Sequence, residues 1–168
     1  MRDELIGFLE KRKISSLPKS DGNTHVTCVH IRRGDFKTYG QAPSDSDFVK
    51  KAIKFIERKE KLKRIERFHI SQNSPSDDLI YSRDNCDVVF VSAAKSTFGW
   101  WIGYFSKGNR VYYTDIKMTN DKTYVSFENL LTAFKEFQRL GHLLEMDYYM
   151  PHWTRIRFSE DKETVIEN

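Results

Sequence analysis

The sequence has few cysteines, prolines and glycines, and it has no long apolar run. Its 168 residues include two cysteines, four prolines and eight glycines. Two cysteines, Cys28 and Cys86, exclude a disulfide-rich miniprotein, and their spacing is not the Cys-x-x-Cys of a metal site. No apolar stretch approaches the ~20 residues that span a bilayer, and the first residues are charged where a signal peptide is apolar. The residues given therefore contain no predicted membrane anchor or secretion signal.

The composition is that of one globular domain. Hydrophobic residues make up 39% of the chain and charged residues 31%, which allows one ordinary core and excludes a disordered chain. The formal net charge is +4, and residues 50–67 carry nine Lys or Arg against three Glu. Because Val49, Ala52, Ile53 and Ile56 form an apolar stripe beside this run, it indicates a solvated helix face, and we expect no nucleic-acid partner.

Alternating strand and helix patterns predict an α/β fold. β-branched and apolar runs predict strands, and apolar residues at helical spacing predict helices. The predicted order is helix 1–15, strand 25–31, helix 46–60, strand 65–71, helix 77–85, strand 87–91, helix 98–105 closed by Gly108, strand 111–114 and helix 127–144. This order favours a Rossmann-like parallel sheet with helices on both faces.

A first polar cluster follows the strand at 25–31. It contains His30, Arg32, Arg33 and Asp35, and it stands where the strand ends. Ligands of open α/β sheets bind beyond the carboxyl ends of the strands, and guanidinium groups bind phosphate oxygens in a two-pronged manner. An exposed salt cluster at the end of a strand explains the same residues equally well.

A second cluster opens the aromatic helix at 98–105. Ser96 and Thr97 precede Phe98 and Gly99, and hydroxyls with free N–H groups at a helix start form a natural anion site. The commoner explanation of one Ser/Thr pair is an ordinary helix cap. Both clusters are predicted at one edge of the sheet, and together they favour a diphosphate ligand.

Neither metal chemistry nor cysteine chemistry is indicated. The five histidines are scattered, with no His-x-x-x-His pair and no Asp-x-Asp, so we expect no metal and no cofactor. No Ser-His-Asp or Cys-His set has an interpretable spacing. Cys28, inside a predicted strand, is expected to be a small core residue.

Three segments carry a specific resemblance. Residues 28–36 (CVHIRRGDF) resemble the HxRRxD(Y/F) motif of the α-1,2-fucosyltransferases, glycosyltransferase family 11. Residues 86–104 are similar to that family's "CDxVI…STFxWWxAYL" segment, and residues 149–156 to its closing "FLPEWVGI". Order and approximate spacing agree over residues 25–158.

The resemblance implies the donor-binding half of a two-domain GT-B enzyme. Such enzymes transfer L-fucose from GDP-fucose to a galactose hydroxyl of a glycan, invert the anomeric carbon and need no metal. By the resemblance, Arg32 grips the β-phosphate, Arg33 supports it or contacts the nucleotide, and His30 and Asp35 shape that grip. His30, Arg32 and Asp35 are therefore the expected catalytic residues, and the general base is not assigned.

The resemblance also assigns the second cluster. Ser96 and Thr97 are expected to cap the diphosphate from the helix side, and Phe98 and Gly99 complete the donor-binding set. The implied partners are GDP-fucose and a galactose-terminated glycan acceptor.

The sequence departs from the family pattern in length. Family members carry a membrane anchor, a stem and an acceptor-side domain before the first motif, where this sequence has about 24 residues. We therefore expect residues 1–24 to be a lead-in helix and loop, residues 25–158 the GDP-fucose-binding domain and residues 159–168 a tail. The family usually has a further strand and helix where residues 56–87 lie here, and His152 stands where an acidic residue is common.

These departures leave two functions open. The first is a fucosyltransferase of the Golgi lumen or Golgi membrane, held there by a segment outside these residues. The second is a short or inactive relative that binds a GDP-sugar or a glycan without turnover.

Overall fold

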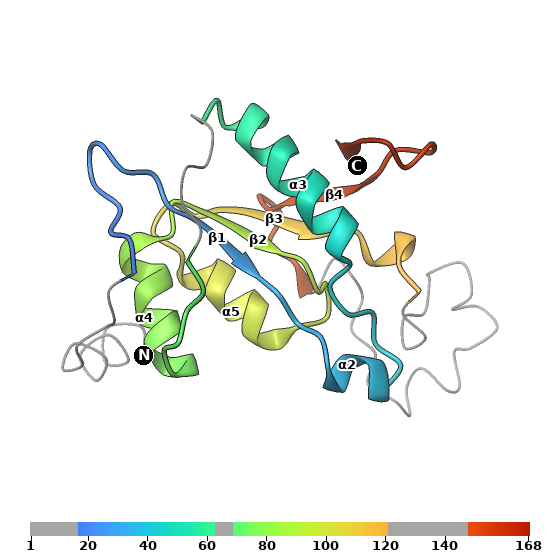
Figure 1. Ribbon diagram of the computed structural model, residues 1–168, viewed down its shortest axis with the longest axis horizontal. Coiled ribbons are helices and arrows are strands. Elements are labelled where there is room, and N and C mark those ends of the chain that lie inside the picture. Colours follow the sequence, from blue (N-terminus) through green and yellow to red (C-terminus); the bar gives the residue numbers. More distant parts are fainter. Residues whose placement is uncertain (1–16, 63–68, 121–147) are drawn as a thin grey trace.

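The computed structural model describes residues 17–62, 69–120 and 148–168, which form a sheet flanked by helices (Figure 1). The strands are β1 (Thr27–His30), β2 (Val88–Val91), β3 (Arg110–Thr114), β4 (Thr154–Phe158) and β5 (Val165–Glu167). They lie side by side in sequence order; β1 to β4 are parallel, and β5 is antiparallel to β4. The predicted Rossmann-like α/β class is confirmed.

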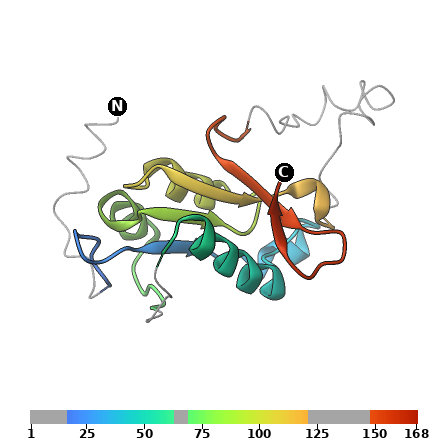
Figure 2. The ribbon, with the colours of Figure 1, turned by 90° about the horizontal axis from the view of Figure 1, so that it is seen from above.

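Helices cover both faces of the sheet. They are α2 (Asp35–Thr38), α3 (Ser46–Lys59), α4 (Pro75–Asn85) and α5 (Thr97–Phe105), with a 3-10 turn η1 (Ile116–Met118) after β3. Figure 2 shows α3 on one face and α4 and α5 on the other. The helices predicted at 46–60, 77–85 and 98–105 are therefore confirmed, with boundaries shifted by one or two residues.

Strand β2 explains why both faces must be covered. All four of its residues are buried, and successive side chains of a strand point to opposite faces. Val88 and Phe90 pack in the core beneath α3, whereas Val89 and Val91 pack in the core that includes Ile102 of α5. The sheet is thus the middle of three layers.

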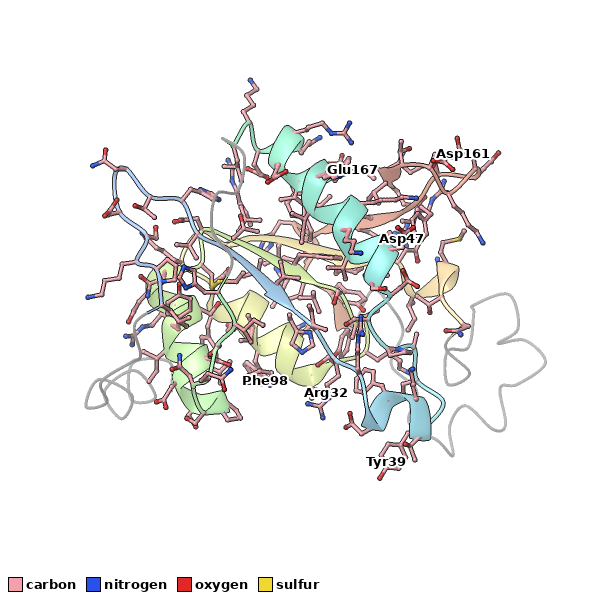
Figure 3. The ribbon with its side chains drawn as sticks, viewed as in Figure 1. Arg32, Tyr39, Asp47, Phe98, Asp161 and Glu167 are labelled. Carbon is pink, nitrogen blue, oxygen red and sulfur yellow. A yellow bond between two sulfur atoms is a disulfide. The ribbon has the colours of Figure 1, made fainter. Side chains whose placement is uncertain are left out.

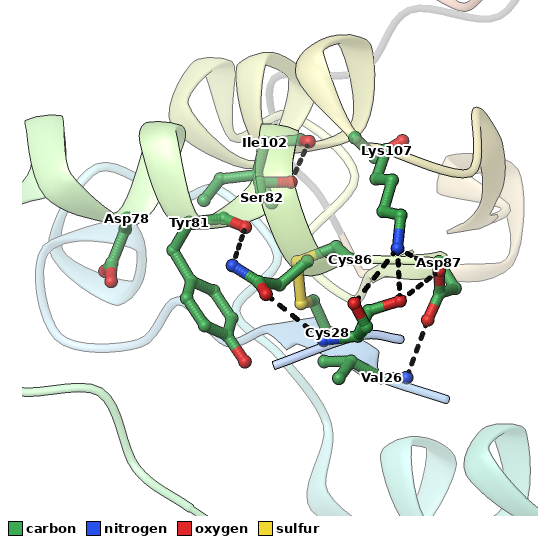
Figure 4. Close-up of a disulfide and its surroundings, with 12 residues drawn as sticks. Val26, Cys28, Asp78, Tyr81, Ser82, Cys86, Asp87, Ile102 and Lys107 are labelled. Carbon is green, nitrogen blue, oxygen red and sulfur yellow. Dashed lines mark hydrogen bonds and ion pairs between the residues drawn. A yellow bond between two sulfur atoms is a disulfide. The ribbon is translucent and has the colours of Figure 1, made fainter. Parts of the chain in front are cut away.

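A disulfide between Cys28 and Cys86 ties β1 to the segment that leads into β2 (Figure 4). Cys28 was expected to be a small core residue; it is partly buried against the core, and its disulfide was not expected. Cys86 ends α4, and the next residue, Asp87, donates its N–H to Val26 O at 2.9 Å, which brings Cys86 beside β1. The two Cα atoms lie 5.6 Å apart, within the range that a disulfide spans.

Gly108 does not close α5 as predicted. The helix ends at Phe105, and its cap is Ser106, whose N–H bonds Gly103 O at 3.1 Å. A Cβ built on Gly108 would lie 1.8 Å from Asp87 O, and the Gly108 N–H bonds Cys86 O at 3.0 Å. The glycine is required because two backbones approach closely there, not because a helix ends.

Some predicted elements lie partly or wholly outside the described residues. These are the helices at 1–15 and 127–144 and the start of the strand at 65–71; residues 69–71 are described and form no strand. Residues 159–168, expected as a tail, contain β5, which extends the sheet. No helix in the described ranges is long and apolar enough to cross a membrane.

Candidate functional site at the carboxyl edge of the sheet

The two predicted clusters meet at the carboxyl ends of β1 and β2. His30 is the last residue of β1 and pairs in register with Val91, the last residue of β2. The chain after β1 turns into α2, and the chain after β2 turns into α5. Figure 3 labels Arg32 and Phe98 at this end of β1. The structure therefore brings both motifs to one edge, as their positions after parallel strands predicted.

His30 and Ser96 join the two motifs directly. The His30 Nε2 atom lies 3.1 Å from Ser96 Oγ, and both side chains are buried. The same Ser96 oxygen accepts the N–H of Gly99 at 3.2 Å, so it is also the N-cap of α5. The interpretation of Ser96 as a helix cap is confirmed, and His30 of β1 holds this cap in place.

Burial keeps His30 neutral. Desolvation, with a smaller contribution from the positive charge of Arg32, lowers the pKa of His30 to about 4. Among the residues that the structure describes, the Nδ1 atom has no hydrogen-bond partner; it faces α5, where a Cβ on Gly99 would lie 2.7 Å from it. Nδ1 is buried and Nε2 contacts Ser96, so His30 lies beneath the exposed groups of the site.

Arg32 and Asp35 form an exposed two-pronged pair. Arg32 Nε donates to Asp35 Oδ1 at 3.0 Å and Nη2 to Oδ2 at 2.6 Å, with both side chains nearly half exposed. This hydrogen bonding raises the pKa of Arg32 and lowers the pKa of Asp35, so both stay charged. The Arg32 guanidinium also lies 5.7 Å from the centre of the Phe36 ring. The guanidinium is therefore fixed in place while part of it faces solvent.

Gly34 makes the tight turn between the arginines and α2. Its φ is +58°, a left-handed conformation that other residues adopt at a cost. The turn lets Asp35 reach back to Arg32 and leaves Arg33 exposed. The Gly of the HIRRGD segment is thus needed for the shape of the cationic loop.

The start of α5 supplies the other side of the site. Thr97 is exposed, and Phe98 is half-buried with its ring edge-on to His30 at 6.0 Å between centroids. Gly99 is buried and lies directly against His30. Thr97 is therefore the hydroxyl that a ligand can meet, while Ser96 faces inward. Among the described residues no cluster of three histidines, cysteines or carboxylates could hold a metal ion.

Two buried serines at this edge were not predicted as site residues. Ser44 Oγ accepts the Arg32 N–H at 2.8 Å, and Ser92 Oγ lies 2.6 Å from His30 O. Ser44 stands just before α3, but the cap of that helix is Asp45, which accepts the Phe48 N–H at 2.7 Å. Only the position of Ser92 directly after a buried strand could have indicated its place here.

Two cavities, of about 240 and 320 Å³, lie elsewhere. The first is lined by residues from the end of α5 and from the segments before β3 and β4, among them Tyr104 and His152. The second lies near Asp87 and Arg110, before β2 and at the start of β3. Neither is lined by a residue of the two polar clusters, so neither cavity is the site at the carboxyl edge.

Comparison with known proteins supports the resemblance. The Caenorhabditis elegans protein named "Putative galactoside 2-alpha-L-fucosyltransferase svh-11" is 41% identical over 202 residues, covering 100% of this chain and 52% of that protein. A second Caenorhabditis elegans protein, named galactoside 2-alpha-L-fucosyltransferase, is 30% identical over 164 residues, 82% of this chain and 41% of its own length. No family model and no solved structure matches the chain.

Relatives that the chain matches are named as glycosyltransferases. More narrowly, the chain is a homologue of proteins named galactoside 2-alpha-L-fucosyltransferase, and the resemblance drawn from its motifs is confirmed. The chain spans about half the length of the curated relatives it matches.

Proposed function

We propose that the chain is the donor-binding part of a fucosyltransferase that transfers L-fucose from GDP-fucose to a galactose hydroxyl of a glycan. The observation that carries this proposal is the 3.1 Å contact between His30 Nε2 and Ser96 Oγ. It holds the cationic loop of Arg32 and Arg33 against the start of α5. A cationic loop and a helix N-terminus at one edge form a site for paired phosphates.

Each group has a separate task in the proposed reaction. Arg32, with Asp35 behind it, and Arg33 face the diphosphate from the loop, and Thr97 faces it from α5. The acceptor oxygen forms a bond to the anomeric carbon as the bond to the β-phosphate breaks, which inverts that carbon. The acceptor proton passes to a base that we do not assign, and the negative charge that develops on GDP is stabilised by the arginines.

This arrangement supports a transfer without a metal. Two guanidinium groups can take the place of a divalent ion beside a leaving diphosphate. The disulfide between Cys28 and Cys86 supports an oxidising compartment, which agrees with the proposed Golgi lumen.

The decisive experiment measures binding and turnover separately. The chain is titrated with GDP by calorimetry, and it is then incubated with GDP-fucose and a β-galactoside, with and without EDTA. We expect GDP binding, release of GDP, a fucosylated product by mass spectrometry, and no effect of EDTA. GDP binding without product would favour a relative that binds the donor only, and absence of GDP binding would refute the proposal.

A further inference from the structure

Ser44 pairs with both backbone groups of Arg32. Its hydroxyl oxygen accepts the Arg32 N–H at 2.8 Å, and its own N–H donates to Arg32 O at 2.8 Å. Ser44 is buried, whereas the Arg32 side chain is nearly half exposed. One buried residue between α2 and α3 therefore determines the backbone position of an arginine that faces solvent.

Ser92 connects this pair to the end of β1. The hydroxyl oxygens of Ser92 and Ser44 lie 2.7 Å apart, and the Ser92 hydroxyl donates to His30 O at 2.6 Å. The Ser92 N–H bonds the same carbonyl at 3.2 Å, and Thr114 Oγ1 donates to Ser92 O at 3.1 Å. The contacts thus reach from β3 through β2 to the loop after β1.

The hydrogen bonds that link Arg32, Ser44, Ser92 and His30 have one consistent donor order. The Ser92 hydroxyl has a single hydrogen, which goes to His30 O, so Ser44 supplies the hydrogen between the two serines. The order runs from the Arg32 N–H to Ser44, from Ser44 to Ser92, and from Ser92 to His30 O. Ser44 and Ser92 are both buried and have hydrogen-bond partners, the condition under which a polar network fixes one conformation.

We propose that Ser44 is a positioning residue which, through Ser92, holds the Arg32 backbone so that the guanidinium meets the donor's phosphates. This inference rests on the proposed function. Ser44 itself does not touch the ligand; it acts through Arg32. Loss of its hydroxyl leaves the Arg32 N–H without its partner and releases the loop from β2.

The test compares Ser44→Ala with Ser82→Ala. Ser82 is a matched control, because it is fully buried and its hydroxyl donates to Ile102 O at 2.7 Å between α4 and α5, away from this edge. Ser92→Ala is the second test variant, and it keeps the Arg32 to Ser44 contact. Two quantities are measured on the full chain: hydrogen exchange of the Arg32 amide by NMR, and the Kd for GDP.

We expect the Arg32 amide to exchange about tenfold faster in Ser44→Ala, and the Kd for GDP to rise about three- to tenfold. Ser92→Ala should raise the exchange rate and the Kd by smaller factors. Ser82→Ala should lower stability without changing the Arg32 exchange rate or the Kd for GDP. Equal effects of Ser44→Ala and Ser82→Ala on both readouts would overturn the positioning role, as would faster exchange with an unchanged Kd.

The exchange measurement needs no ligand, so it separates the two proposals. If the wild-type chain does not bind GDP, the proposed function fails and the role of Ser44 toward the nucleotide fails with it. In that case faster Arg32 exchange in Ser44→Ala alone would still support the hydrogen-bond chain, and unchanged exchange would refute it.

Discussion

His30 Nε2 lies 3.1 Å from Ser96 Oγ, and this buried contact makes a strand end and a helix cap one unit. The contact places a buried ionisable ring of β1 against α5. A neutral His30 is compatible with this environment, and a charged one is not, which is why burial lowers its pKa to about 4.

The first prediction concerns stability at low pH. In the folded chain His30 stays neutral, whereas an unfolded chain takes up a proton on this residue below its ordinary pKa of 6.5. The unfolded state therefore binds more protons, and stability falls as the pH drops from about 6.5 to about 4, by roughly 3 kcal/mol. Urea unfolding at several pH values measures this loss of stability. His30→Asn should remove this part of the pH dependence, and the exposed His69 provides the matched control, His69→Asn.

The second prediction concerns Gly99. A Cβ on this residue would lie 2.7 Å from His30 Nδ1 and 2.9 Å from Val91 Cγ1. Although alanine suits a helix better than glycine does, the buried ring and the strand cannot both move away, so we expect Gly99→Ala to destabilise the fold by about 1–3 kcal/mol. Thermal unfolding measures the loss. Gly22→Ala, where a Cβ meets nothing within 4 Å, is the control; a stabilised Gly99→Ala would contradict the packing described.

Elements whose signal is local could be predicted from the sequence. β2 is a short run of four buried apolar residues between polar ones, and α3 combines a cap at Asp45 with an apolar stripe. The place of the site also followed from local signals, because His30 ends one parallel strand and Ser96 lies in the turn that follows the next. Helix patterns and strand ends depend on residues that are close in the sequence, so they can be predicted from it.

Contacts between distant segments could not be predicted. Cys28 and Cys86 are 58 residues apart, and their pairing depends on how α4 delivers the chain to β2. Ser44 and Ser92 are 48 residues apart, and Ser44 stands among residues that cap helices equally well. The glycine at 108 is explained only by Asp87, which lies in another segment.

The third prediction concerns the disulfide. Joining residues 58 apart removes conformational freedom from the unfolded chain, which corresponds to about 4 kcal/mol for a loop of this length. Reduction, or the double change Cys28→Ser with Cys86→Ser, should lower the urea midpoint accordingly. Reductant should have no further effect on the double variant. An unchanged midpoint after verified reduction would show that the bond contributes no stability.

The last prediction concerns Arg32 and Asp35. Arg32→Ala removes a charge-assisted phosphate contact from an exposed side chain, so the fold should persist while GDP binding weakens by about 2–3 kcal/mol. Asp35→Asn should weaken it less, because the guanidinium remains but loses the carboxylate that orients it. Arg58→Ala, on the exposed face of α3, removes an equal charge far from this edge and should leave the Kd for GDP unchanged. Calorimetric titration measures all three, and an unchanged Kd in Arg32→Ala would exclude Arg32 from the donor site.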